Sequence, residues 1–146
     1  MNMNERIETY SPADTQALGE KLGQEAKAGQ VYCQNGDLGV GKTVFTKGFA
    51  KGLGIEEHIT SPTFTIINEY EGRLPLYHFD VYRIADEDEM EYTGYEDYFY
   101  GQGVCLVEWA ELVKGLIPED AIWITVEKDY TQDNEDYRCI TIRQEG

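Results

Sequence analysis

The feature that most constrains this chain is a glycine-rich stretch of eight residues. It occupies Gly36–Thr43, reads Gly-Asp-Leu-Gly-Val-Gly-Lys-Thr, and fits the pattern G-x-x-x-x-G-K-[ST] in full. Glycines allow the backbone to curl so that consecutive N–H groups point inward at an anion. The pattern therefore predicts a phosphate-binding loop that joins a strand to a helix.

The residues on both sides of this stretch match that prediction. Val31–Asn35 is a short, mostly apolar run typical of a strand. After the loop, apolar and small residues follow the i, i+3, i+4, i+7, i+8 spacing of an amphipathic helix: Phe45, Gly48, Phe49, Gly52 and Leu53. The glycines on that face predict close packing on a sheet, and Gly54 predicts the end of the helix. A chance match of a glycine-rich turn is therefore strongly disfavoured.

The chemistry expected of this loop is the binding of Mg-ATP. The helix presents its positive amino-terminal end to a phosphate. Lys42 supplies a mobile charge for the β- and γ-phosphates, and the Thr43 hydroxyl is a hard oxygen ligand suited to Mg²⁺. The other predicted nucleotide-binding positions are Gly36, Asp37, Leu38, Gly39, Val40 and Gly41.

Two acidic residues are candidates for the metal and for catalysis. Glu108 ends the apolar run Val104–Val107, where sheet topology carries a strand end towards a phosphate loop. Asp80 lies in a strand-like segment whose alternation puts it on one face with His78, and it could orient the attacking water or bind the water shell of the metal. A solvated acid at a strand end is the alternative for Glu108, and an exposed polar face is the alternative for Asp80. His78 is interpreted as structural, because phosphoryl transfer needs charge and positioning more than an imidazole.

The remaining patterns predict one α/β domain over residues 1–146, with a P-loop NTPase-like mixed β-sheet flanked by helices. Ser11 is a helix N-cap followed by Pro12. One or two short helices are expected in Asp86–Asp97. The predicted strands are Ile7–Tyr10, Phe64–Tyr70, Leu74–Arg83, Ile122–Glu127 and Arg138–Arg143, in addition to those around the loop.

The composition of the chain limits the kinds of partner that the protein is expected to bind. The formal net charge of −16 argues against direct, non-specific binding of nucleic acid or of an anionic membrane. No apolar run is long enough to span a membrane, and the start has no apolar signal segment, so a cytoplasmic protein is expected. Cys33, Cys105 and Cys139 lie in apolar runs and are interpreted as small buried side chains.

Several other residues keep two interpretations. Ser61-Pro62-Thr63 is a plain turn or a switch segment that senses the γ-phosphate. Trp109 is a core residue or a lid over the site, with core as the default. Arg73, Arg83 and Arg138 are candidate phosphate or partner contacts, although single arginines are usually surface groups.

Taken together, these motifs resemble the TsaE (YjeE) family, the ATPases of bacterial tRNA threonylcarbamoyladenosine (t6A) synthesis. The similarity extends from Ser11 to the last strand. The residues that carry it are Gly36–Thr43, Phe45–Gly48, Leu53-Gly54, Ser61–Phe64, His78–Arg83, Tyr95–Phe99, Gly103–Cys105 and Val107–Trp109.

The resemblance implies an ATPase that acts on the partner proteins TsaD and TsaB to support their turnover, and that meets tRNA only through that complex. It implies that Lys42 and Thr43 hold phosphate and Mg²⁺, that Glu108 is the acid on the metal side, and that Asp80 is needed for hydrolysis. Ser11 and Thr15 match a nucleotide-contact segment of the family, and Arg138 matches a basic residue near the nucleotide.

One residue departs from the family pattern, and two other functions are alternatives to the ATPase. Val40 stands where the family usually has alanine, which leaves the backbone donors intact. A small-molecule P-loop kinase could use the same loop, but Lys114 is the only basic residue between Glu108 and the last strands, so an arginine-rich lid is missing. A binding module without catalysis is disfavoured by the presence of both Asp80 and Glu108.

Overall fold

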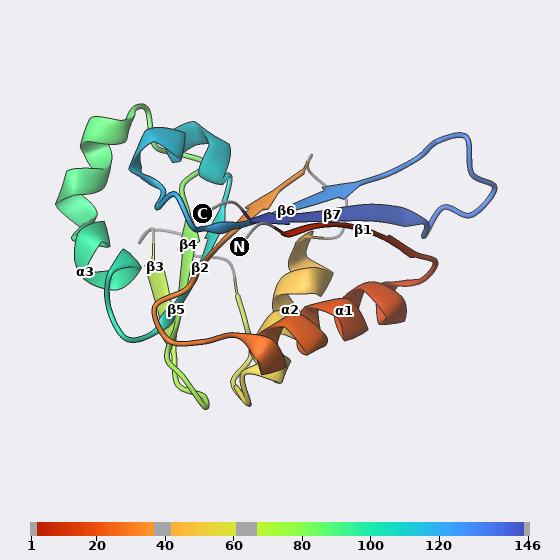
Figure 1. Cartoon of the computed structure of the whole chain (residues 1–146), viewed down its shortest axis with the longest axis horizontal. Coiled ribbons are helices and arrows are strands. Elements are labelled where there is room, and N and C mark those ends of the chain that lie inside the picture. The colour runs from red at the N-terminus through yellow and green to blue at the C-terminus, as the bar shows by residue number, and fades with distance from the viewer. Residues whose placement is uncertain (1–2, 37–41, 61–66, 145–146) are drawn as a thin grey trace.

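The computed structural model describes residues 3–36, 42–60 and 67–144 (Figure 1). Within these ranges, the strands are β1 (Met3–Thr9), β2 (Val31–Asn35), β3 (Ile67–Tyr70), β4 (Leu76–Asp80), β5 (Val104–Glu108), β6 (Ile122–Glu127) and β7 (Arg138–Gln144). The helices are α1 (Pro12–Glu25), α2 (Lys42–Gly52), α3 (Tyr95–Phe99) and the 3-10 helices η1 (Glu87–Thr93) and η2 (Ala110–Leu116).

The described strands form a single sheet of mixed direction. Their order is β1-β7-β6-β2-β5-β4-β3. The central strand β2 runs parallel to β6 and to β5, and β5 runs parallel to β4. The outer pairs β1–β7, β6–β7 and β3–β4 are antiparallel. The predicted single-domain α/β fold with a mixed sheet is therefore confirmed.

Helices cover both faces of this sheet and enclose two apolar clusters. On one face, α1 and α2 pack over side chains such as Tyr32, Leu106 and Ile124. On the other face, η1, α3 and η2 pack over Cys33, Phe79 and other apolar side chains. Figure 1 shows α1 and α2 side by side below the sheet, and η1, α3 and η2 above it and to its left. Continuous apolar runs such as β5 are explained by this double burial.

The glycines of α2 do not face the sheet as their spacing predicted; they face α1. Gly48 lies against the backbone of Gln16, and Gly19 of α1 lies against the backbone of Phe45. Gly23 and Gly52 extend this contact by one helical turn. The absence of Cβ atoms lets the two backbones approach closely, while Phe45 and Phe49 of α2 supply the contacts to the sheet. The prediction of close packing was right, but the partner element was wrong.

Local signals explain how α1 begins and ends. The Ser11 hydroxyl accepts a hydrogen bond from the backbone N–H of Asp14 at 3.1 Å, as expected for an N-cap. At the other end, the Arg73 guanidinium donates to the carbonyls of Gly23 at 2.8 Å and Ala26 at 2.9 Å. A cation there satisfies terminal carbonyls and complements the helix dipole. Arg73 is therefore a structural cap, and the idea that it contacts phosphate or a partner is not supported.

Two of the three cysteines are buried, as the sequence interpretation expects, and the third is only partly buried. Cys33 and Cys105 are buried on the same face of the adjacent strands β2 and β5, where the register partner of Cys33 is Val107 and that of Cys105 is Val31. Cys139 is half-buried, and all three are free thiols. Among the described residues, no helix is long and apolar enough to cross a membrane.

The contact between α1 and α2 generates the first prediction. Gly48→Ala is expected to lower the free energy of unfolding by about 1–3 kcal/mol, because a Cβ there overlaps the Gln16 carbonyl. Urea unfolding measures this, with the exposed Lys47→Ala on the same helix as the matched control, expected to change it by less than about 0.5 kcal/mol. Equal effects of the two substitutions would contradict the close helix contact.

A second prediction concerns thiol reactivity. Burial raises the pKa of the Cys105 thiol to about 12 and also raises the pKa of Cys33. A raised pKa keeps a thiol protonated until the pH approaches that value, so neither group forms the reactive thiolate near neutral pH. Timed labelling at roughly pH 8, read by mass spectrometry, is expected to modify Cys139 first and the other two only on unfolding, where their pKa returns to about 8.5. Labelling of all three at one rate would refute this.

Candidate functional site at the carboxyl ends of the parallel strands

A row of polar side chains crosses the sheet where three parallel strands end. Glu108 of β5 is the register partner of Gln34 in β2 and of Asp80 in β4. Register partners point to the same face of a sheet, so all three side chains share one face. That face is the one covered by α2, because Tyr32 and Leu106, two residues earlier on their strands, belong to the apolar cluster beneath α1 and α2. The two acids predicted from sequence therefore lie side by side on adjacent strands.

Gln34 connects this row to the start of α2. It is fully buried, and its Nε2 donates to the carbonyl oxygen of Lys42 at 3.1 Å. Its Oε1 accepts from the Thr46 hydroxyl at 3.1 Å. Between these two elements the backbone of Gly36 takes a φ of 142°, which favours glycine. The first turn of α2, with Lys42 and Thr43, is thus fixed beside the carboxyl end of β2, and sequence reasoning gave Gln34 no role.

Lys42 and Trp109 form a contact that the sequence did not reveal. The Lys42 ammonium lies 3.6 Å from the centroid of the Trp109 ring and donates to the Gly36 carbonyl at 2.8 Å. A cation over an indole face is a favourable cation–π arrangement. Trp109 has a φ of 64°, the one positive value among the described non-glycine residues. Its backbone N–H donates to the Gln34 carbonyl at 3.2 Å. Trp109 is therefore a wall of the site that also packs on the second cluster, rather than a simple core residue.

The two acids have different surroundings. Glu108 is 7% exposed, and its Oε2 accepts a hydrogen bond from Nε2 of the buried His78 at 3.1 Å. Asp80 is half-buried, and its Oδ1 accepts from the backbone N–H of Tyr82 at 3.0 Å. The carbonyl of Glu108 accepts from the N–H of Val81 at 3.3 Å, which holds the chain after Asp80 against the end of β5. Glu108 is thus fixed within the protein, while Asp80 retains contact with solvent.

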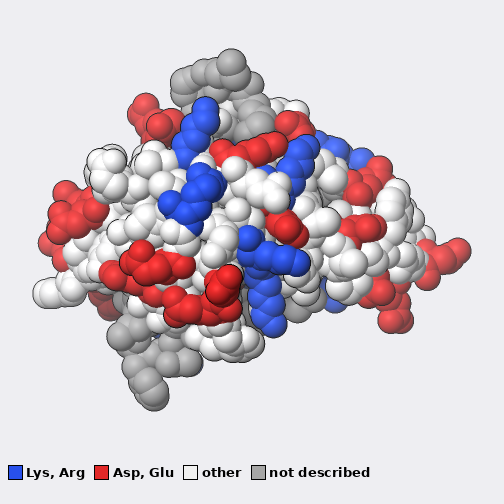
Figure 2. Space-filling view, turned by 90° about the horizontal axis from the view of Figure 1, so that it is seen from below, with Lys and Arg blue, Asp and Glu red and all other residues white. Residues whose placement is uncertain are grey.

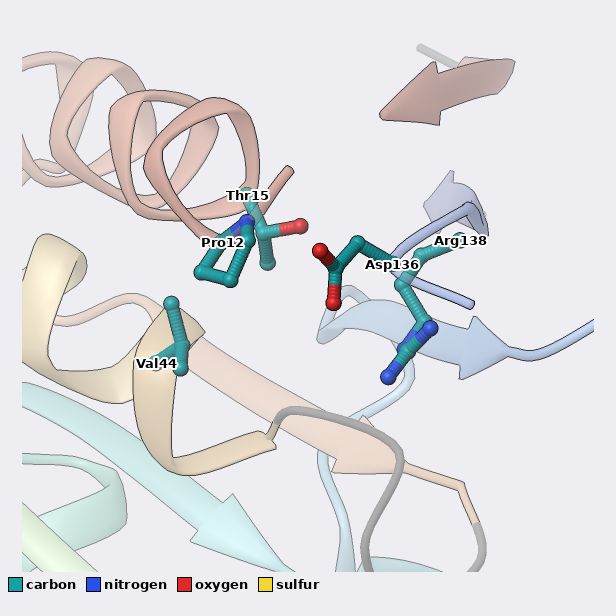
Figure 3. A pocket seen from close by; sticks show the side chains of 5 residues that line it. All are labelled: Pro12, Thr15, Val44, Asp136 and Arg138. Atoms are coloured by element: carbon teal, nitrogen blue, oxygen red, sulfur yellow. The ribbon is translucent and has the colours of Figure 1, made fainter. Parts of the chain in front are cut away.

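A small pocket lies next to this site, between the starts of α1, α2 and β7. Its volume is about 50 Å³, and it is lined by Pro12, Thr15, Val44, Asp136 and Arg138 (Figure 3). Arg138 also donates to the carbonyl of Glu135 at 2.7 Å. Figure 3 shows the Asp136 carboxylate on the side of the pocket opposite Pro12 and Thr15. The structure therefore brings together Thr15 and Arg138, which are far apart in sequence, beside the helix that carries Lys42 and Thr43.

Of the other predicted positions, some have side chains that are hydrogen-bonded within the protein, and the rest lie outside the described ranges. The Thr15 hydroxyl is buried and hydrogen-bonded to that of Thr9 at 2.8 Å, and Ser11 caps α1. The predicted loop residues Asp37, Leu38, Gly39, Val40 and Gly41, and the possible switch Ser61-Pro62-Thr63, lie outside the described residues.

The residues near the start of α2 suit a magnesium ion that is also bound by phosphate. Mg²⁺ prefers hard oxygen ligands and usually takes one or two from the protein, with the rest from phosphates and water. The exposed hydroxyl of Thr43 and the carboxylate of Glu108 are such donors. The described part of the chain contains no group of three His, Cys, Asp or Glu residues that could hold a metal ion by themselves. The donor chemistry thus fits an ion shared with a bound phosphate rather than a cage of protein ligands.

The fold and site define a class of protein: a single-domain α/β protein whose candidate site surrounds the helix that follows its central parallel strand. Residues 9–138 match the family described as "Threonylcarbamoyl adenosine biosynthesis protein TsaE". The chain belongs to the TsaE family, which is involved in t6A modification of tRNA, and this confirms the resemblance found in the sequence.

Individual relatives agree with this assignment. The chain is 51% identical over 139 residues to the tRNA threonylcarbamoyladenosine biosynthesis protein TsaE of Bacillus subtilis, covering 94% of this chain and 84% of the relative. It is 45% identical over 121 residues to the protein of the same name from Treponema pallidum, covering 83% and 90%. Among solved structures, Bacillus subtilis YdiB matches with a TM-score of 0.81 and 44% identity, over 100% of this chain and 88% of that one.

The role of Gln34 generates a third prediction. Gln34→Leu is expected to lower the free energy of unfolding by about 1–3 kcal/mol, because the Thr46 hydroxyl would be left buried without its partner. The same change at the exposed Gln102 is the matched control and should be close to neutral. Urea unfolding of the two variants checks this, and equal stabilities would show that Gln34 does not hold α2 to the sheet.

Proposed function

We propose that this protein binds and hydrolyses Mg-ATP in support of t6A modification of tRNA. The observation that carries the proposal is that Gln34 holds the first turn of α2, with Lys42 and Thr43, at a sheet edge where Glu108 pairs with Gln34 and with Asp80. A helix start with a lysine and a hydroxyl binds phosphate, and acids on the two neighbouring strands supply the metal and water sites of a phosphohydrolase. Membership of the TsaE family supports the same biological context.

In this proposal each residue has a separate task. Lys42 exchanges its contacts with the Gly36 carbonyl and the Trp109 ring for the β- and γ-phosphates. Mg²⁺, when bound, neutralises charge on the phosphates, and Thr43 and Glu108 are the residues that would hold it. Asp80 orients the attacking water with the carboxylate oxygen that does not accept from Tyr82. Hydrolysis then depends on positioning and charge, which is what phosphoryl transfer requires.

The pocket lined by Thr15 and Arg138 suits part of the nucleoside rather than a phosphate. The Asp136 carboxylate on its wall would repel an anion, whereas Pro12 and Val44 offer apolar surface to a base or a ribose. The Ser11 hydroxyl, which accepts one hydrogen bond as the N-cap, can still donate to a ligand. The family resemblance likewise assigns a nucleotide contact to Ser11 and Thr15 and a place near the nucleotide to Arg138.

We propose that TsaD and TsaB are the partners that activate hydrolysis, with tRNA bound by them and not by this chain. The net charge of −16 favours basic protein surfaces over a direct contact with nucleic acid. Figure 2 shows that charges are unevenly distributed, with basic residues near the middle of the face seen there and acidic residues on both sides of it.

The test is ATP hydrolysis by the purified protein in Mg²⁺, alone and with the TsaB–TsaD pair. Slow hydrolysis alone and strong stimulation by the pair is the expected result. Substantial activity that the pair leaves unchanged would contradict the partner assignment. Bound ATP without hydrolysis under either condition would contradict the enzymatic function.

Substitutions in the site provide a fourth prediction. Lys42→Ala is expected to weaken ATP binding roughly 10–100-fold, since a charge-assisted hydrogen bond is worth about 1.5–3 kcal/mol. In a chelator, Glu108→Ala and Asp80→Ala are expected to bind ATP almost normally, and in Mg²⁺ they are expected to hydrolyse it at least about tenfold more slowly, because they act on metal and water geometry. Calorimetry in the chelator and phosphate release in Mg²⁺ measure the two effects, with Lys47→Ala as the control. Equal losses of ATP affinity in all three variants would contradict this division of roles.

A further inference from the structure

His78 occupies a buried position in β4, between β5 and the edge strand β3, where a histidine is unexpected. It is 2% exposed and lies in β4, two residues before Asp80 and on the same face. Its register partner in β5 is Leu106, so it reaches diagonally to Glu108, two residues further along that strand. The Nε2–Oε2 distance of 3.1 Å makes this a direct hydrogen bond inside the protein.

The hydrogen bond between His78 and Glu108 determines which atom donates, which accepts, and which atoms stay outside the bond. A carboxylate without a proton can only accept, so Nε2 carries the hydrogen and donates to Oε2. The other ring nitrogen, Nδ1, is buried and has no hydrogen-bond partner within the described part of the chain. In the same part of the chain, Glu108 has no other side-chain hydrogen bond. One oxygen of Glu108 is therefore committed to His78, and Oε1 remains for the site.

Packing alone does not account for a histidine here. Two of its neighbours in the sheet, Leu76 and Leu106, belong to the apolar cluster under α1 and α2. Its register partner in β3 is Asn68, whose side-chain amide donates to Thr60 and Tyr70 and not to the imidazole. An imidazole with one unpaired buried nitrogen is less favourable in such surroundings than an aliphatic side chain of similar size. Because it is 2% exposed, His78 also cannot touch a bound nucleotide. What the imidazole does supply is a rigid donor aimed at Glu108.

We infer that His78 is a positioning residue for Glu108: it fixes the carboxylate so that Oε1 faces the metal side of the site. The inference rests on the proposed function, because it assigns a support to the acid that would hold Mg²⁺. Carboxylates that bind metals are themselves usually oriented by hydrogen bonds, and loss of such a partner typically costs about 10–100-fold in metal affinity or activity. His78 acts through Glu108 and not on the nucleotide.

The test compares two replacements of His78. His78→Leu removes the donor but fills the apolar space, whereas His78→Gln keeps an N–H donor at similar reach. The measured quantity is the ratio of ATP affinities with Mg²⁺ and with a chelator, by calorimetry, together with thermal unfolding. We expect His78→Leu to lower this ratio of affinities by about tenfold or more, while the ATP affinity in chelator and the melting temperature stay the same. His78→Gln should recover most of that ratio, and the exposed His58→Leu should change nothing.

A double-mutant cycle separates positioning from a general structural effect. In a Glu108→Gln background, His78→Leu should not lower the ratio of ATP affinities any further, because the carboxylate through which His78 acts is already absent. A full additional loss, or a His78→Gln variant as defective as His78→Leu, would overturn the inference. Unchanged dependence on Mg²⁺ in His78→Leu would overturn it as well.

These outcomes are distinct from failure of the proposed function. If the wild-type protein binds Mg-ATP but never hydrolyses it, the hydrolytic function fails while the affinity ratios still test His78. If the wild-type protein gains no ATP affinity from Mg²⁺ yet hydrolyses ATP with its partners, the function stands and the role of His78 is refuted.

Discussion

The parallel register of β2, β5 and β4 is the constraint on which the site depends. It aligns Gln34, Glu108 and Asp80 across the sheet on the face covered by α2. A slip of β5 by one residue would turn Glu108 towards the opposite apolar cluster, where a carboxylate has no partner. Burial on both faces of β5 therefore fixes the register, and the register places the acids beside the start of α2.

The site departs from the rules that the rest of the fold follows. Lys42 is 8% exposed and Glu108 is 7% exposed, although charged side chains are usually left in water. Trp109 has a backbone conformation that is rare for a bulky residue. Such costs are tolerated because the two apolar clusters and the glycine contact between α1 and α2 stabilise the surrounding fold. Unfavourable features concentrated at one edge of an otherwise regular sheet are typical of functional sites.

Much of this arrangement could be predicted from local sequence patterns. The strand–loop–helix order, the Ser11 cap, the hairpin of β3 and β4, and the mixed sheet all follow from periodicity and turn residues. The place of Glu108 at the end of a strand next to β2 also followed, because a short apolar run that ends in an acid predicts a central parallel strand.

Contacts between residues distant in sequence could not be predicted in this way. The Arg73 cap on α1, the Lys42–Trp109 contact and the bond between His78 and Glu108 depend on how the elements pack. The helix glycines were recognised as a packing signal, but their partner is α1, which only tertiary structure determines. Likewise, β1 pairs along its whole length with β7 at the other end of the chain, and neither strand contains a signal for the other. Sequence patterns thus identify which residues pack or form hydrogen bonds, but not which distant residues they contact.

We propose that the start of α2 and the acids of β4 and β5 form one site for a magnesium nucleotide. A crystal structure of the protein with ADP and Mg²⁺ tests it most directly. We expect the β-phosphate at the first turn of α2, the Lys42 ammonium on the phosphate instead of the Trp109 ring, and the metal held by Thr43 and Glu108. A nucleotide bound elsewhere, or a metal distant from both residues, would contradict it.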